Sequence, residues 1–137
     1  MASTLVSMGW PAMTKAKKIR VLVVEDHPIL RMGLGIFFAT EDDLVMVGEA
    51  SNGQEGVDLC DQLQPDVVLM DLGLPVMDGL TATSIITHRN PSTRVVILTN
   101  TLAVERERAA KRAGAYSYLE KNVSNDTLAA AIRAAAE

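Results

Sequence analysis

Residues 67–79 read VVLMDLGLPVMDG, an apolar run that passes into an aspartate and then into a segment with glycine and proline. The run Val67–Met70 contains only apolar residues, which is typical of a parallel strand covered by helices on both faces. Asp71 stands at the carboxyl end of this expected strand. Ligands of open parallel sheets bind beyond the carboxyl ends of the strands, so Asp71 marks the edge where a site is expected.

The alternation of short β-branched runs with stretches of helical spacing occurs five times from residue 19 onward. This alternation predicts an α/β protein, a (βα)5 doubly wound parallel sheet, whose apolar first, third and fourth strands form the centre. We expect strands at Ile19–Val24, Leu44–Glu49, Val67–Met70, Arg94–Leu98 and Tyr116–Leu119. We expect helices at about Pro28–Phe38, Gly53–Leu63, Leu80–His88, Val104–Ala113 and Asn125–Ala135.

Residues at the ends of these helices support the division. Pro28 suits a first helical turn, and Asn52 and Ser124 are residues that cap helix N-termini. Gly114 follows the fourth helix, where a C-terminal glycine is expected.

The size and composition of the chain are those of one soluble globular domain, with 137 residues, 48% hydrophobic and a net charge of −4. Its apolar runs are far shorter than the ~20 residues that cross a bilayer, so no membrane contact is expected. The single cysteine, Cys60, cannot form an internal disulfide, and nothing indicates an oxidising compartment. A cytoplasmic location is the default expectation.

The first 18 residues differ in charge from the rest of the chain. They carry three lysines and no acidic residue, whereas all 17 acidic residues and 10 of the 13 basic residues follow. The acidic body argues against nonspecific nucleic-acid binding, and the lysines of the tail favour solvation over a nucleic-acid or membrane contact. We expect residues 1–18 to form a disordered tail, with a transit peptide as the weaker alternative, and residues 19–136 to form one domain.

Three other features have plain structural interpretations. Cys60 occurs at helical spacing among apolar neighbours, which predicts a core position. Gly33 and Gly35 in the first helix are explained by close packing against a neighbour. His27 has no second histidine near it, so we expect a surface or capping role in place of a metal-ligand role.

Polar residues gather at the carboxyl ends of the expected central strands. Glu25 and Asp26 follow the first strand, Asp71 ends the third, and Thr99 and Lys121 follow the fourth and fifth. Three carboxylates in one pocket repel one another unless a cation offsets them, and Mg²⁺ fits because it takes few carboxylates and keeps positions for phosphate oxygens. With a hydroxyl and a lysine added, the set predicts a site for a phosphoryl group.

This arrangement resembles the receiver domain of two-component response regulators, and the likeness covers residues 19–136. It is carried by Glu25-Asp26, the stretch from Asp71 to Gly79, Thr99 and Lys121, each after a successive strand. The resemblance implies the flavodoxin-like fold with strand order 2-1-3-4-5. The segments EDHP at 25–28 and VGEA at 47–50, with Arg31, Gly33 and Leu34, resemble the NarL/FixJ branch, which usually carries a LuxR-type output domain.

The resemblance implies a role for each matching residue. Asp71 is the implied phosphoacceptor, which attacks a phosphohistidine on a kinase or phosphotransfer protein, or a small donor such as acetyl phosphate. Asp26 is the implied direct ligand of Mg²⁺ and Glu25 a ligand through water. Asp71 and the backbone carbonyl of Gly73 complete the implied ligand set.

The remaining implied roles concern the phosphoryl group and the switch. Thr99 and Lys121 are the implied contacts of the phosphoryl oxygens. Tyr118 matches the aromatic switch position, whose ring turns inward when the Thr99 hydroxyl moves toward the phosphoryl group. The implied readout surface consists of the fourth helix, the fifth strand and the fifth helix.

The chain departs from the family pattern at three positions. Asn100 stands where a small residue usually follows the threonine, which can narrow access to the phosphoryl group. Asn122 replaces the proline that often follows the lysine, so no cis peptide is expected there. Leu74 takes the place of the common methionine before Pro75 and conserves its volume.

Three competing functions have weaker support. A flavodoxin-like FMN carrier needs a hydroxyl- and glycine-rich phosphate loop after the first strand, where this chain has the acidic pair. An aspartyl phosphohydrolase places its Asp-x-Asp motif on the first strand. A pseudo-receiver that acts only as an interaction module is disfavoured by the intact acids, threonine and lysine.

The resemblance also implies partners and limits. It implies a sensor histidine kinase or phosphotransfer protein as partner, leaves a homodimer open, and assigns DNA binding only to an output domain beyond these residues. The chain is not expected to be an enzyme, since it catalyses only its own phosphorylation and hydrolysis. The kinase, the stimulus and the promoters are not specified by these residues.

Overall fold

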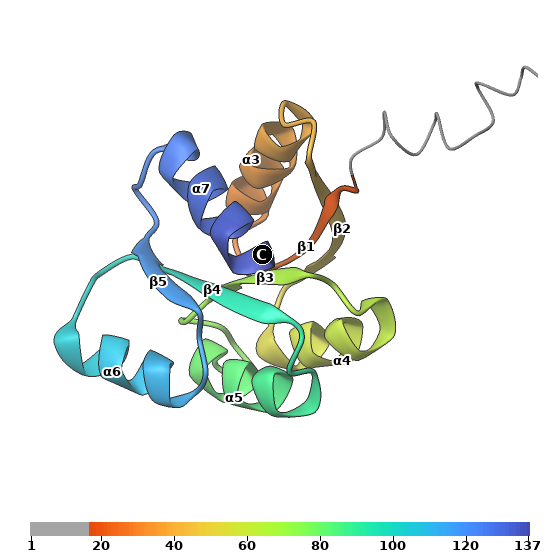
Figure 1. Cartoon of the computed structure of the whole chain (residues 1–137). Helices are drawn as coiled ribbons and strands as arrows, with labels where there is room; N and C mark the ends of the chain where they lie inside the picture. Colours follow the sequence, from red (N-terminus) through yellow and green to blue (C-terminus); the bar gives the residue numbers. More distant parts are fainter. Residues whose placement is uncertain (1–16) are drawn as a thin grey trace, which may run out of the picture.

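The computed structural model describes residues 17–137, which form a five-stranded parallel sheet between two layers of helices (Figure 1). The predicted disordered tail therefore lies outside the described residues except for Lys17 and Lys18. The strands are β1 (Ile19–Val24), β2 (Leu44–Ala50), β3 (Val67–Asp71), β4 (Arg94–Thr99) and β5 (Ser117–Glu120). The helices are α3 (Pro28–Ala39), α4 (Gly53–Leu63), α5 (Gly79–Arg89), α6 (Val104–Arg112) and α7 (Asn125–Ala136).

The sheet has the order β2-β1-β3-β4-β5, which confirms the predicted fold class and strand order. Each predicted element is present, and its ends differ from the prediction by one residue at most. Helix α5 begins at Gly79 and not at Leu80, because the Asp78 carboxylate accepts a hydrogen bond from the Thr81 N–H at 2.9 Å. The predicted caps are confirmed, since the side chains of Asn52 and Ser124 accept from backbone N–H groups three residues later.

Alternate residues of the central strands enter two separate cores, one on each face of the sheet. Helices α3 and α7 cover one face of the sheet, and α4, α5 and α6 cover the other (Figure 1). In β1, Val21 and Val23 pack on the side of α3 and α7, whereas Leu22 and Val24 pack on the side of α4, α5 and α6. Each of these side chains is at most 1% exposed, and burial of one such side chain stabilises the fold by roughly 1.5–3 kcal/mol. This two-sided burial explains why the central strands have no polar alternation.

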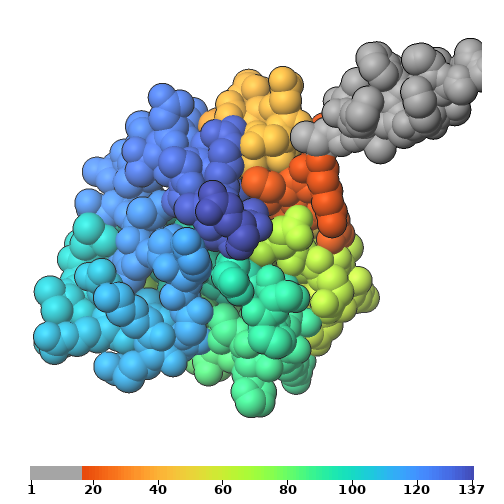
Figure 2. Space-filling view, viewed as in Figure 1, coloured from red at the N-terminus to blue at the C-terminus, as the bar shows by residue number. Residues whose placement is uncertain are grey.

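Helices α3 and α7 lie side by side over one face, as the orange and blue regions of the space-filling view show (Figure 2). A charged contact joins α7 to the segment that follows α3. The Arg133 guanidinium on α7 donates to the Asp43 carboxylate at 2.7 and 2.8 Å and to Glu41 at 2.7 Å. This contact ties the last helix to the segment between α3 and β2.

The two glycines of α3 differ in their surroundings. A Cβ on Gly35 would lie 3.1 Å from Met46 Cε, so the predicted close packing is confirmed there. At Gly33 nothing lies within 4 Å of such a Cβ, so the packing explanation is wrong for this residue. Cys60 is fully buried as predicted, and burial is the main cause that raises the pKa of its thiol to about 11.

We expect Gly33→Ala to stabilise the protein by about 1 kcal/mol, because alanine restricts the unfolded chain and favours the helix without a clash. Urea denaturation of the variant and the wild type measures this difference. Gly35→Ala is the control, and its gain should be smaller because Met46 must move. Loss of stability in Gly33→Ala would contradict the open surroundings of this position.

We expect Asp43→Asn to lower stability at neutral pH. The hydrogen bond from Arg133 lowers the pKa of Asp43 below the ordinary value of 3.8, so the ionised carboxylate stabilises the fold above that value and the contribution is lost as pH falls through the lowered pKa. Denaturation curves of the variant and the wild type should therefore converge in acid. Asp42→Asn, at an exposed neighbour, should match the wild type throughout. A pH-independent deficit of Asp43→Asn would contradict this linkage.

Candidate functional site

The strand register brings the predicted site residues to one edge of the sheet. Val24 pairs with Met70, so Glu25 and Asp71 follow at the same level of β1 and β3. The Lys121 N–H donates to the Thr99 carbonyl at 2.8 Å, which aligns the ends of β4 and β5. Four segments that are distant in the sequence, at the ends of β1, β3, β4 and β5, therefore contribute to a single cluster.

Lys121 lies between two buried carboxylates. Its Nζ is 2.7 Å from Glu25 Oε1 and 3.0 Å from Asp71 Oδ1. The side chains of Glu25 and Asp71 are only 4% and 7% exposed, and that of Lys121 is 12% exposed. Desolvation makes such charges costly unless they are paired, so Lys121 is the principal counter-charge of this cluster.

The pKa directions of these groups follow from the shared lysine. Burial raises the pKa of Glu25, but hydrogen bonds from Lys121 and His27 outweigh it, and the net pKa lies below the ordinary value. For Asp71, burial is the largest cause and the charges of Glu25 and Asp26 add to it, so its pKa is raised despite Lys121. Desolvation lowers the pKa of Lys121, but the interactions with Glu25 and Asp71 raise it by more. The net pKa of Lys121 therefore lies above the ordinary value. One lysine thus does not balance the acids around it.

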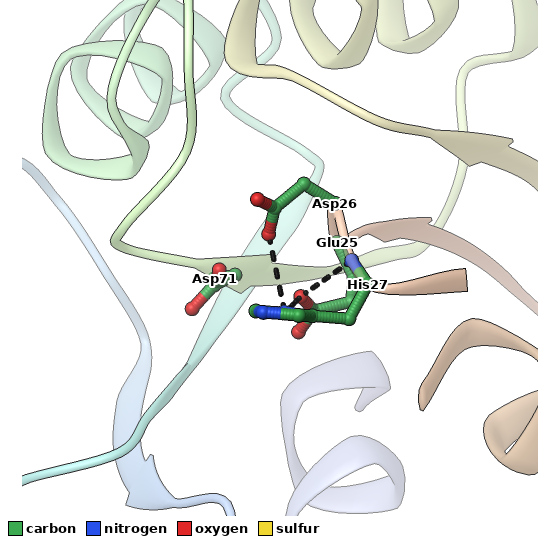
Figure 3. A group of neighbouring side chains, drawn as sticks. All are labelled: Glu25, Asp26, His27 and Asp71. Atoms are coloured by element: carbon green, nitrogen blue, oxygen red, sulfur yellow. Dashed lines mark hydrogen bonds and ion pairs between the residues drawn. The ribbon is translucent and has the colours of Figure 1, made fainter. Parts of the chain in front are cut away.

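Asp26 and His27 complete the cluster, as Figure 3 shows. Asp26 Oδ1 is buried and has no hydrogen-bond partner among the described residues. His27 stands at the N-cap position of α3, but its side chain makes no capping hydrogen bond. Its ring is 63% exposed, as predicted for a surface residue, and Nδ1 bonds Glu25 Oε2 at 2.7 Å. The sequence interpretation missed this contact.

The cluster fits a divalent cation. Ligand atoms from Glu25, Asp26, His27 and Asp71 all lie within 4.8 Å of one another. Three carboxylates face a single lysine, and one carboxylate oxygen, Asp26 Oδ1, is buried without a hydrogen-bond partner among the described residues. A hard cation with oxygen ligands offsets the excess negative charge and satisfies that oxygen.

A hollow of about 320 Å³ opens beside Asp71. Thr99, Gly73, Asn100 and Arg106 line it together with Asp71, so two further predicted site residues lie at the same place. The Thr99 hydroxyl donates to the Thr101 carbonyl at 3.3 Å. Asn100 is exposed and lines the wall of this hollow together with Asp71. The hollow is large enough for a phosphoryl group.

Tyr118, the predicted switch residue, packs against the core on the α4, α5 and α6 side of the sheet. Its hydroxyl is buried and has no hydrogen-bond partner within residues 17–137. A buried hydroxyl without a hydrogen-bond partner costs free energy, so this orientation of the Tyr118 ring is less stable than one in which the hydroxyl is bonded.

The segment after Asp71 contains a strained turn that the sequence did not predict. The Met77 N–H donates to the Pro75 carbonyl at 2.7 Å, and Val76 between them has φ of 68°, which β-branched residues rarely adopt. The Met77 carbonyl in turn accepts from the Gly53 N–H at 3.1 Å, and a Cβ on Gly53 would collide with it. This contact with α4 holds the turn in its strained form.

Two of the departures at the predicted site have clear structural outcomes. No peptide bond among the described residues is cis, which confirms the expectation for the bond before Asn122. Leu74 is 8% exposed and packs into the core on the α4, α5 and α6 side of the sheet.

Comparison with known proteins identifies the family. Residues 21–133 match the family model described as response regulator receiver domain, and the chain belongs to this family. The chain is 42% identical over 119 residues to the transcriptional regulatory protein LiaR of Bacillus subtilis, which covers 87% of the chain and 56% of LiaR. It is 34% identical over 124 residues to the nitrate/nitrite response regulator NarL of Escherichia coli, which covers 90% of the chain and 57% of NarL.

A solved structure supports the same assignment. The signal receiver domain of the putative response regulator NarL from Mycobacterium tuberculosis superposes with a TM-score of 0.85 at 28% identity, covering 88% of this chain and 98% of that domain. These matches confirm the predicted NarL/FixJ branch. The chain spans about half the length of the curated relatives it matches. No helix within residues 17–137 is long and apolar enough to cross a membrane.

We expect Asp26→Asn to raise stability in EDTA by about 1 kcal/mol, because the variant removes one of three mutually repelling carboxylates. In Mg²⁺ the wild type should be the more stable of the two proteins, since a cation at one hundred times its dissociation constant stabilises the wild type by about 2.7 kcal/mol. Urea denaturation with EDTA and with MgCl2 measures both effects. Equal responses of the two proteins to Mg²⁺ would place the cation elsewhere.

Proposed function

We propose that this receiver domain is a phosphoacceptor of a two-component system and that Asp71 accepts the phosphoryl group. The observation that carries the proposal is the buried Asp71 carboxylate, which is bonded to Lys121 beside the unsatisfied Asp26 oxygen and opens onto a hollow. This combination provides a nucleophile, a cation for an incoming anion and space for it.

Asp26, Asp71 and the Gly73 carbonyl hold Mg²⁺ in this proposal, and Glu25 contributes through a water molecule. When bound, the ion supplies positive charge that offsets the developing charge on the phosphoryl oxygens. The Asp71 carboxylate attacks phosphorus, so an O–P bond forms while the P–N bond to the donor histidine breaks and its electron pair stays on nitrogen. Lys121 then exchanges a carboxylate contact for a phosphoryl oxygen.

The switch follows from the two weakly held hydroxyl groups near the site. The Thr99 hydroxyl has one long contact, at 3.3 Å, and leaves it for a phosphoryl oxygen. The Tyr118 ring then changes its packing next to α6, so the face formed by α6, β5 and α7 differs between the two states. New charge-assisted hydrogen bonds bias two arrangements of similar energy.

The donor in this proposal is a sensor histidine kinase or a phosphotransfer protein, with acetyl phosphate as a small alternative, and the domain works in the cytoplasm. The output is control of transcription, in line with relatives that are named as transcriptional regulators and of which this chain covers about half. DNA binding then belongs to an output domain and not to residues 19–136. The domain converts no metabolite and catalyses only its own phosphorylation and hydrolysis.

We expect acetyl phosphate with Mg²⁺ to add one phosphoryl group to the wild type and none to Asp71→Asn, because the amide is not a nucleophile toward phosphorus. Intact-protein mass spectrometry measures the mass increase. Asp78→Asn is a matched control, because Asp78 caps α5. This variant should be labelled like the wild type. Labelling of Asp71→Asn at the wild-type rate would exclude Asp71 as the acceptor.

A further inference from the structure

His27 places a ring nitrogen inside the acidic cluster, and the function proposed above does not use it. Nδ1 lies 2.7 Å from Glu25 Oε2 and 3.3 Å from Asp26 Oδ1. In Figure 3 this edge of the ring faces the space between the carboxylates, next to Asp71. The nitrogen therefore belongs to the group of atoms that a cation would contact.

The separations agree with the spacing of ligands around one ion. Nitrogen and oxygen donors at about 2.0–2.2 Å from a metal lie about 2.8–3.4 Å apart when they occupy neighbouring corners of its coordination polyhedron. Of the two distances from His27 Nδ1, 3.3 Å lies within that range and 2.7 Å lies just below it. The ring is exposed over 63% of its surface, so small rotations that direct the Nδ1 lone pair inward meet little resistance.

The chemistry of a nitrogen donor differs from that of the carboxylates. Mg²⁺ takes oxygen ligands and gains little from an imidazole, whereas first-row transition ions such as Ni²⁺ and Zn²⁺ bind imidazole nitrogen strongly. We propose that His27 is a ligand of transition ions in this cluster, so that Ni²⁺ or Zn²⁺ binds through His27 Nδ1 and the Asp26 and Asp71 carboxylates. The inference rests on the proposed function, which assigns the same cluster to a cation.

In this arrangement Nδ1 coordinates through its lone pair, while Nε2 carries the proton on the solvent side of the ring. The ion lies between His27 Nδ1 and the carboxylates of Asp26 and Asp71, where Asp26 Oδ1 lacks a hydrogen-bond partner among the described residues. Ions of both classes then compete for one site, but only the transition ion depends on His27.

The test uses the metal-free full chain and isothermal titration with NiCl2 and, separately, MgCl2. We expect His27→Ala to weaken Ni²⁺ binding about tenfold or more, with Mg²⁺ binding changed less than about twofold. His88→Ala is the matched control, because the chain has two histidines and His88 lies in the last turn of α5, away from the cluster. It should change neither affinity, and excess Mg²⁺ should weaken Ni²⁺ binding to the wild type.

A spectroscopic readout separates coordination from a structural effect. Cu²⁺ bound to the wild type should show nitrogen superhyperfine lines in electron paramagnetic resonance, and His27→Ala should lose them while His88→Ala keeps them. Equal Ni²⁺ affinity in His27→Ala and the wild type overturns the inference, as does a parallel loss of Ni²⁺ and Mg²⁺ binding. If the wild type binds Mg²⁺ but not Ni²⁺, only the inference about His27 is overturned. If it binds neither ion, the proposed cation site is overturned as well.

Discussion

The contact between Lys121 and the two buried carboxylates of Glu25 and Asp71 is the interaction on which the site depends. It joins the ends of β1, β3 and β5, and it neutralises charge that the low-dielectric edge of the sheet would otherwise not tolerate. The balance is incomplete, because Asp26 adds a third carboxylate with an unsatisfied oxygen. This shortage of positive charge favours the binding of a cation in the cluster.

The fold maintains this cluster by burying apolar side chains on both faces of the strands that carry it. β1, β3 and β4 have side chains in both cores, so a shift of one strand along its neighbour would disrupt packing on both sides. The register is therefore firmly set, and the ends of the strands stay level. The turn at Val76 is strained, and a contact with the start of α4 supports it. The paired strands thus hold the residues of the site at one level of the sheet edge.

Much of the fold was predictable from local patterns, and particular residues show why. The run Val67–Met70 has no polar alternation, and Asn52 and Ser124 cap helices through their own side chains, so each was recognised without knowledge of distant contacts. The turn at Val76 was not predicted, because a β-branched residue gives no sequence signal for a positive φ. Gly33 was misjudged for a related reason, since the space around a helix residue depends on what packs above it.

For the site, the residue types and their places after successive strands were enough to predict the family and the acidic pocket, because chemistry and strand ends are local properties of the chain. Pairwise geometry was not accessible in this way. That Lys121 bonds Glu25 as well as Asp71, that Asp26 keeps an unpartnered oxygen and that the His27 ring turns toward the acids are contacts set by the assembled sheet. Glu25 and Lys121 are 96 residues apart, and only packing of the intervening strands determines their separation.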